Sequence, residues 1–102
     1  MKVLALETQV PGGTFTEEIL RREARKVWEL YQSGVIREMY FSASRHRAVL
    51  VLESAGPDEA RAALAELPLV QAGAIDFELH TLVPYPGFAR LFEPGAEQAQ
   101  PR

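Results

Sequence analysis

The period of the hydrophobic pattern changes repeatedly along this chain, and the order of the changes constrains the fold more than any other feature. Residues 2–10, KVLALETQV, are rich in apolar and β-branched residues and stop at the turn sequence PGG, which is typical of a strand. A helical period follows, in which Thr14 and Glu17 fit a capping box at the start and Ser33 and Gly34 form the end. The positions expected to face the core are Ile19, Leu20, Ala24, Val27, Trp28, Leu30 and Tyr31.

The second half of the chain repeats this order. Residues 35–43, VIREMYFSA, and 46–54, HRAVLVLES, predict two strands of an antiparallel hairpin, because only a short polar segment separates them. Residues 55–68 have a proline and acids in a first turn and predict one helix, and residues 74–83 predict a last strand. The order β-α-β-β-α-β predicts a ferredoxin-like α+β fold, in which two helices cover one face of a four-stranded antiparallel sheet.

Length and composition predict one small domain. The chain has 102 residues, and we expect residues 1–92 to form a single domain and residues 93–102, EPGAEQAQPR, to be a disordered tail, because the tail has no apolar period. A domain of this size has a high ratio of surface to volume, which favours self-association.

Charge and cysteine content exclude several classes of function. With a net charge of −3, the chain has no basic surface for a run of phosphates, so we expect no nucleic-acid partner. No apolar run is long enough to span a membrane, and the first residues do not resemble a signal peptide, so we expect no membrane partner. The absence of cysteine favours the cytoplasm, and two histidines without metal-ligand spacing predict no bound metal.

The two middle strands of the predicted sheet are apolar on both faces. Ala48, Leu50 and Leu52 alternate with Val49 and Val51 in the third strand, and only one face of the sheet can be covered by helices. A second subunit is therefore expected to cover the other face, which would give a dimeric α+β barrel or a higher homo-oligomer. The aromatic segment PYPGFARLF, which follows the last strand, is expected to dock on a neighbour or to cover a sheet edge.

Polar side chains recur at every second position of the last strand. Ile75 and Phe77 are expected to face the helices, whereas Asp76, Glu78 and His80 face the other way. Such a row either forms a solvated or interfacial ladder of charges or lines a partly dry cavity, where charges are costly unless they are paired or used. His46, between two arginines, is expected at the surface.

Several segments resemble the muconolactone isomerase family: SGVIREMY, LVLES, LAELPL and AIDFELHTLVPYP. The similarity runs from residue 1 to about residue 90. The residues that match the family pattern are Gly34, Arg37, Glu53, Leu67, Pro68, Leu69, Asp76, Glu78 and Pro86. The resemblance implies a ferredoxin-like protomer, a dimeric barrel, and a site between helices and sheet or near the subunit boundary. It also implies cofactor-free isomerisation of a small unsaturated lactone or related acid in aromatic catabolism. At two positions where the family commonly has histidine, this chain has Glu38 and Tyr85.

The implied reaction moves a proton between two carbons through a dienolate, so it needs a base, a donor for the dienolate oxygen and a binding group for the substrate. The candidate catalytic residues are Glu78, Glu38, Tyr40 and His80, of which the glutamates could be the base and the other two the donor. Arg37 and Asp76 are the substrate-binding candidates, and Arg37 suits a carboxylate. Arg37 and Glu38 would point to opposite faces of a regular strand unless a bulge intervenes. The alternatives are a non-catalytic protein that binds a small ligand, an accessory protein, or a cofactor-free monooxygenase on the same scaffold.

Overall fold

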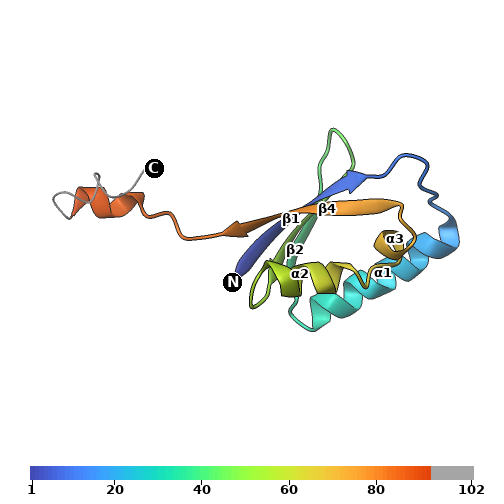
Figure 1. Cartoon of the computed structure of the whole chain (residues 1–102), viewed down its shortest axis with the longest axis horizontal. Helices are drawn as coiled ribbons and strands as arrows, with labels where there is room; N and C mark the ends of the chain where they lie inside the picture. Colours follow the sequence, from blue (N-terminus) through green and yellow to red (C-terminus); the bar gives the residue numbers. More distant parts are fainter. Residues whose placement is uncertain (93–102) are drawn as a thin grey trace.

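The computed structural model describes residues 1–92, so the predicted tail lies outside the described residues. The elements are β1 (Lys2–Gln9), α1 (Glu17–Gln32), β2 (Ile36–Phe41), β3 (Ala48–Glu53), α2 (Pro57–Leu64), α3 (Pro68–Gln71), β4 (Ile75–Leu82) and the 3₁₀ helix η1 (Gly87–Leu91). The strands form one antiparallel sheet in the order β2-β3-β1-β4 (Figure 1). This order confirms the predicted ferredoxin-like fold.

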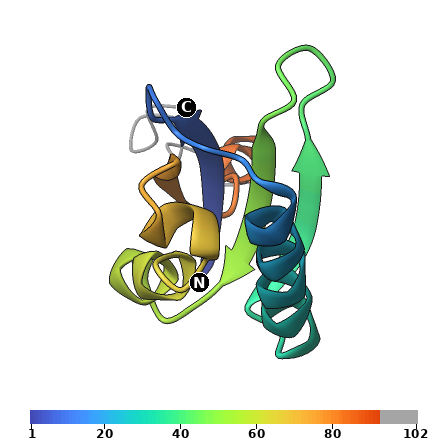
Figure 2. The same cartoon turned by 90° about the vertical axis from the view of Figure 1, so that its right-hand side faces the viewer.

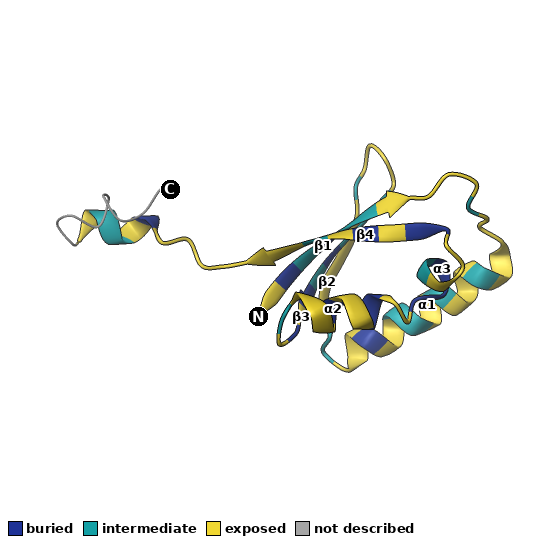
Figure 3. Cartoon of the chain, in the orientation of Figure 1, coloured by how far each residue is buried: buried dark blue, intermediate teal, exposed yellow. Residues whose placement is uncertain are grey.

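Both long helices lie on the same side of the sheet (Figure 2). We call the covered side the helix face and the opposite side the outer face. The core lies between the helix face and the helices, and Val3, Leu52 and Ile36 on the strands are completely buried there with Leu67 (Figure 3). Because side chains alternate along a strand, each residue of a regular strand lies on either the helix face or the outer face.

Helix α1 begins later than the capping box predicted. Its N-cap is Thr16, whose side-chain oxygen accepts a hydrogen bond from the backbone N–H of Ile19 at 3.2 Å. Thr14 lies before the helix, so the prediction that Thr14 and Glu17 form the capping box is wrong. The reason is the close approach of Gly13 to Ala74, which holds this part of the chain against the start of β4 before the helix can begin.

The buried side of α1 is rotated relative to the prediction. Leu30 is buried, and Ile19 and Val27 pack partly buried against the core. Trp28 is 56% exposed and Tyr31 is 45% exposed, so the expectation that these two aromatic residues lie in the core is wrong. Their rings contact each other on the flank of the helix, with centroids 6.0 Å apart. The apolar stripe was wider than the surface that one sheet can cover, and sequence spacing alone does not decide which edge of a wide stripe is buried.

The predicted second helix is interrupted. Helix α2 ends at Leu64, and the separate short helix α3 begins at Pro68. Leu67, between them, has φ −70° and ψ 130°, the extended conformation that a following proline favours. The interruption turns the completely buried side chain of Leu67 into the core.

Strand β2 contains a β-bulge at Arg37. Ile36 pairs with Leu52 of β3, whereas Glu38 pairs with Val51, so Arg37 is the extra residue. Beyond the bulge, Glu38 and Tyr40 share the outer face, and the residues of β2 on the helix face are Ile36, Met39 and Phe41. In a regular strand Ile36 and Glu38 would share a face, and the bulge places them on opposite faces.

Residues 83–92 leave the body of the protein beyond β4, and we call this segment the arm (Figure 1). The arm carries five large apolar side chains that are 63–79% exposed: Val83, Tyr85, Phe88, Leu91 and Phe92. Tyr85 and Phe88 pack edge to face, with ring centroids 5.1 Å apart. Within residues 1–92, no helix is both long enough and apolar enough to cross a membrane.

Candidate functional site

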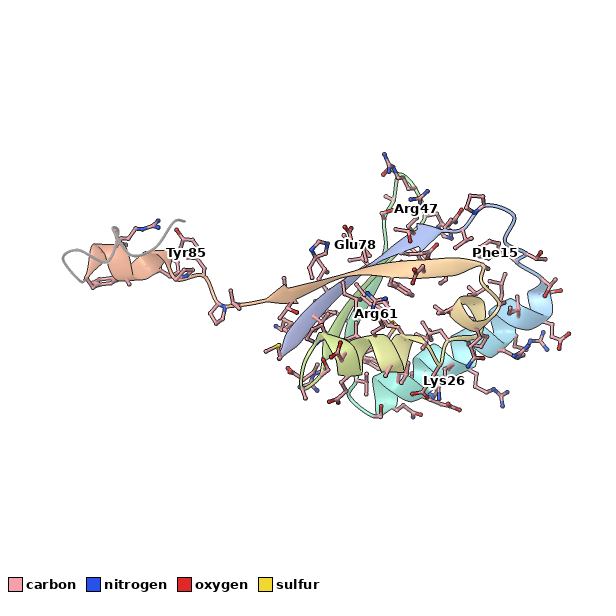
Figure 4. The ribbon with its side chains drawn as sticks, viewed as in Figure 1. Phe15, Lys26, Arg47, Arg61, Glu78 and Tyr85 are labelled. Carbon is pink, nitrogen blue, oxygen red and sulfur yellow. The ribbon has the colours of Figure 1, made fainter. Side chains whose placement is uncertain are left out.

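A cavity of about 660 Å³ lies between α1 and the helix face of the sheet. Its walls are mostly apolar and come from α1 and the segment before it, from the four strands, and from the region of α3. The apolar lining residues are Phe15, Leu20, Ala24, Val27, Met39, Phe41, Ala48, Leu50, Leu67, Leu69, Ile75 and Phe77. Phe15, an exposed lining residue, stands at the end of the molecule opposite the arm (Figure 4). The volume falls in the range of roughly 300–1,000 Å³ that is usual for small-molecule sites.

Glu23 brings a carboxylate into this apolar cavity from α1. It lies one helical turn from both Ile19 and Val27, and therefore in the stripe that faces the core. The backbone N–H of Leu69 donates a hydrogen bond to its Oε1 at 3.0 Å. Burial raises the pKa of Glu23, the hydrogen bond from Leu69 opposes this increase, and the charge of Glu7 raises the pKa further.

Glu7 supplies a second carboxylate from β1. It lies on the helix face, two residues after Ala5 and directly opposite Phe77 of β4. The backbone N–H of Ala48 donates to its Oε1 at 3.0 Å. A backbone amide therefore anchors each of the two carboxylates, and both groups line the cavity.

His46 lies where the β2–β3 hairpin meets the cavity. Its imidazole stacks on the ring of Phe41, with centroids 4.4 Å apart and an angle of 10° between the planes. His46 has φ 54°, a backbone conformation that is uncommon for a residue other than glycine. It is exposed, as expected from sequence, but it also lines the cavity. Gln9, two residues beyond Glu7, is a further polar lining residue.

The candidate residues of the last strand lie on the outer face, away from the cavity. Asp76, Glu78 and His80 are exposed there, and the Glu78 carboxylate lies 3.4 Å from His80 Nε2. The side chain of Asp76 accepts a hydrogen bond from the backbone N–H of Phe77 at 2.8 Å. Glu78 projects from the sheet on the side away from the helices (Figure 4).

Glu38 and Tyr40 also lie on the outer face, but at the other edge of the sheet, and Tyr40 is at the same time one of the residues that line the cavity. The Tyr40 hydroxyl donates to Glu38 Oε1 at 2.9 Å, and this hydrogen bond, with the charge of Glu38, raises the pKa of Tyr40. Strands β3 and β1 lie between this pair and the pair Glu78–His80. Three strand spacings of about 4.8 Å separate the two edges by roughly 14 Å. One chain therefore brings the four candidate catalytic residues together as two separate pairs.

Arg37 lies at the bulge and is not a lining residue of the cavity. Its guanidinium reaches back toward Gly34, where a Cβ would lie 3.6 Å from Nη1. The amino group of Met1, by hydrogen bond and charge, is the main cause that lowers the pKa of Glu53, and the charge of Arg37 lowers it further. Arg37 thus belongs to the end of the sheet away from the cavity.

Sequence reasoning missed Glu7 and Glu23, although a signal for each is visible. Val3 and Ala5 predict that residue 7 continues the core-facing row of the first strand, so an acid there is unusual. Glu23 stands between Ile19 and Val27 at helical spacing, which puts an acid in the apolar stripe. In both cases the signal is a charged residue that interrupts an apolar period.

The centre of the outer face is apolar. Leu4 and Leu6 of β1 lie beside Val51 and Val49 of β3, and all four are partly exposed. We call these four residues the outer patch. Charged and polar side chains border it on both edge strands. Within residues 1–92, no group of three or more His, Asp or Glu side chains is arranged to hold a metal ion.

Comparison with known protein families and with curated protein sequences finds no match. Solved structures do match. Muconolactone isomerase superposes with a TM-score of 0.70 and 19% sequence identity, over 84% of this chain and 92% of that chain. The 5-chloro-2-hydroxyhydroquinone dehydrochlorinase from Burkholderia phenoliruptrix AC1100, in complex with 2,5-dihydroxybenzoquinone, superposes with a TM-score of 0.59 and 16% identity, over 83% and 96% of the two chains. The chain therefore has the ferredoxin-like α+β fold of muconolactone isomerase.

Proposed function

We propose that this protein is a cofactor-free isomerase that moves a proton between two carbons of a small unsaturated cyclic substrate, such as an unsaturated lactone. One observation carries the proposal: Glu23 holds a carboxylate in an apolar cavity, and burial raises its pKa. A carboxylate whose pKa is raised is a stronger base than a solvated one, and its protonated form can hold the proton until it is returned to the substrate.

The reaction requires no partner other than the substrate. The Glu23 carboxylate takes a proton from a carbon that a conjugated carbonyl makes acidic, and the electron pair of that C–H bond moves into a dienolate. The protonated Glu23 then returns the proton to a different carbon of the dienolate. The double bond has shifted, no atom is lost, and the enzyme is regenerated.

Neighbouring polar groups complete the proposed site. The charge of Glu7 favours the protonated form of Glu23, which holds the proton between the two half-reactions. Three residues that line the cavity carry a hydrogen-bond donor: Gln9, His46 and Tyr40. The Tyr40 hydroxyl donates to Glu38, so the side-chain amide of Gln9 and the ring N–H of His46 are the proposed donors to the dienolate oxygen.

The comparisons support a ring-shaped substrate. Muconolactone isomerase, by its name, isomerises a lactone, and the dehydrochlorinase of the same fold was solved with a six-membered ring compound. Both kinds of compound fit a cavity of about 660 Å³. We place the proposed reaction in the breakdown of aromatic compounds on this basis.

The outer-face residues remain a second proposed site. Glu38, Tyr40, Glu78 and His80, with Arg37 and Asp76 as binding residues, could form a site only where a second subunit covers the outer face and brings opposite sheet edges together. The separation of roughly 14 Å between the two edges within one chain, three strand spacings, is the reason that we rank the cavity first.

We also propose that the partner of this chain is a second copy of itself. The outer patch is a contiguous apolar surface on the face that no helix covers, and soluble monomers rarely leave such a surface bare. The arm adds five exposed apolar side chains on a segment that points away from its own body, so a neighbouring copy is the surface within its reach. A homodimer or a larger assembly would bury both features.

Hydrogen exchange in deuterated water tests the proposed reaction. Muconolactone and a panel of unsaturated lactones are incubated with the protein, and NMR follows deuterium at the acidic carbon, which detects proton transfer even when turnover is slow. Glu23→Gln should slow the exchange at least about 100-fold, the usual contribution of a general base. Glu18→Gln, an exposed change on the same helix, is the matched control and should have no effect.

The same assay decides between the two sites. Loss of exchange in Glu78→Gln together with full exchange in Glu23→Gln would move the site to the outer face. Binding without exchange for every compound would instead favour the non-catalytic alternative.

A further inference from the structure

The charged lining of the cavity has only one sign. Glu7 and Glu23 both line it, and none of the described residues that line it is Lys or Arg. A carboxylate-bearing ligand would therefore bring a third negative group into an apolar space without a cationic side chain to receive it. Like charges in such a space repel strongly, and burial of an unpaired charge is unfavourable.

The two carboxylates are also arranged as hydrogen-bond acceptors. Oε1 of Glu7 accepts from the backbone of Ala48, and Oε1 of Glu23 accepts from the backbone of Leu69. An ionised carboxylate has acceptor sites on both oxygens and donates no hydrogen bond, so each group can still accept further hydrogen bonds. A hydroxyl group of a ligand can donate a hydrogen bond to these free acceptor sites without adding charge.

The apolar walls favour a flat ring. Phe15, Phe41 and Phe77 line the cavity from the segment before α1, from β2 and from β4. Aromatic side chains on separate elements can contact the faces and edges of a ring that lies between them. The cavity thus combines an aromatic wall with acceptor-only charged groups.

We propose that this cavity selects an uncharged ring compound whose hydroxyl groups donate to Glu7 and Glu23, and that it discriminates against rings that carry a carboxylate. This inference rests on the proposed function for its choice of site and narrows the substrate class of that site. It predicts that a neutral phenol or enol binds and that a lactone acid is a poor ligand.

Equilibrium binding with three matched ligands tests the inference independently of turnover. Hydroquinone has the ring and two donors, 2,5-dihydroxybenzoate adds a carboxylate to them, and 1,4-dimethoxybenzene keeps the ring but has no donor. Isothermal titration calorimetry of the full chain at pH 8 should show hydroquinone binding at least tenfold more tightly than either of the other two compounds.

Variants link the preference to the carboxylates. In Glu23→Gln the preference for hydroquinone over 2,5-dihydroxybenzoate should fall by at least threefold, because one of the two repelling charges is gone. Glu18→Gln, exposed on the same helix, should keep the full preference. Circular dichroism of both variants confirms that the fold is intact.

Two outcomes would overturn the inference. Equal or tighter binding of 2,5-dihydroxybenzoate would show that a cation reaches the cavity, and absence of hydroquinone binding at millimolar concentration would show that the acceptors do not recognise hydroxyl donors. Neither outcome touches the proton-transfer proposal, which the exchange assay tests separately. If the wild-type protein catalyses no hydrogen exchange but still binds hydroquinone selectively, the proposed reaction is refuted and the proposed ligand class stands.

Discussion

Substitution of Gly13 by alanine should destabilise the fold through a clash between two segments that meet next to the cavity. A Cβ at Gly13 would lie 2.8 Å from the Cα, 2.9 Å from the carbonyl oxygen and 3.1 Å from the Cβ of Ala74. Carbon atoms in contact prefer about 3.5–4.0 Å, so the two segments would have to separate by roughly 0.7 Å or more. Two of the three contacts are with backbone atoms, which cannot rotate out of the way.

The expected cost follows from these contacts. Overpacking of this kind costs about 1–3 kcal/mol. The backbone of Val10 also donates to the carbonyl of Ala74 at 3.1 Å. A separation that weakens this bond adds up to about 1 kcal/mol, for a total of roughly 1–4 kcal/mol. For a domain of this size that corresponds to a decrease in Tm of roughly 4–30 °C.

Thermal and urea unfolding followed by circular dichroism measure the effect. Gly12→Ala is the matched control, because its Cβ would meet open space and its cost comes only from φ +82°. It should cost about 1–2 kcal/mol, less than Gly13→Ala. Ala74→Gly in the Gly13→Ala background removes only the contact at 3.1 Å and should recover less than half of the loss. A Gly13→Ala protein within about 0.5 kcal/mol of wild type, the usual range for surface changes, would refute the reasoning.

Further predictions concern Glu23, the outer patch and the start of α1. Because the folded-state pKa of Glu23 is raised, its contribution to stability is present below the unfolded pKa of about 4.3 and is lost as the pH rises through the folded value. Glu23→Gln should therefore gain stability relative to wild type between pH 4 and pH 8 in urea titrations, and a constant difference would contradict the burial of this carboxylate. Val51→Lys should shift sedimentation at micromolar concentration toward the 11.4 kDa monomer without unfolding the chain, whereas a wild-type protein that is already monomeric would remove the proposed partner. Thr16→Ala should cost about 1 kcal/mol through loss of the N-cap, and Thr14→Ala should be nearly neutral in the same denaturation assay.

The strand order was predictable because it depends on features that a sequence displays locally. Short runs of apolar and β-branched residues between turn signals marked the strands, helical spacing marked α1 and α2, and the short segment between β2 and β3 required an antiparallel hairpin. The end of α1 at Ser33 and Gly34 was also predictable, because Gly34 has φ +85°. Features that depend on tertiary contacts, such as the rotation of α1 that exposes Trp28, were not.

The candidate site was harder to predict than the fold. Asp76, Glu78 and His80 attract attention in the sequence because they alternate cleanly, yet clean alternation is also what an exposed face produces. Glu7 and Glu23 are less conspicuous, and their surroundings depend on which elements pack together. Sequence spacing assigns a residue to a face, but only the packing of α1 over the sheet shows that two acids share a cavity. The catalytic role of the outer-face residues stays a prediction.

The bulge at Arg37 also changes how this chain should be aligned with other sequences. One residue is inserted into β2, so an alignment carried through this strand without a gap exchanges the two faces of every position that follows. Met39 and Phe41, which line the cavity, would be matched to outward-facing residues of a regular strand, and Glu38 to a core position. The transfer of active-site residues from a relative whose strand is regular should therefore place a one-residue gap at Arg37. Deletion of Arg37 would make the strand regular while keeping Glu38 on the outer face and Met39 and Phe41 on the cavity wall.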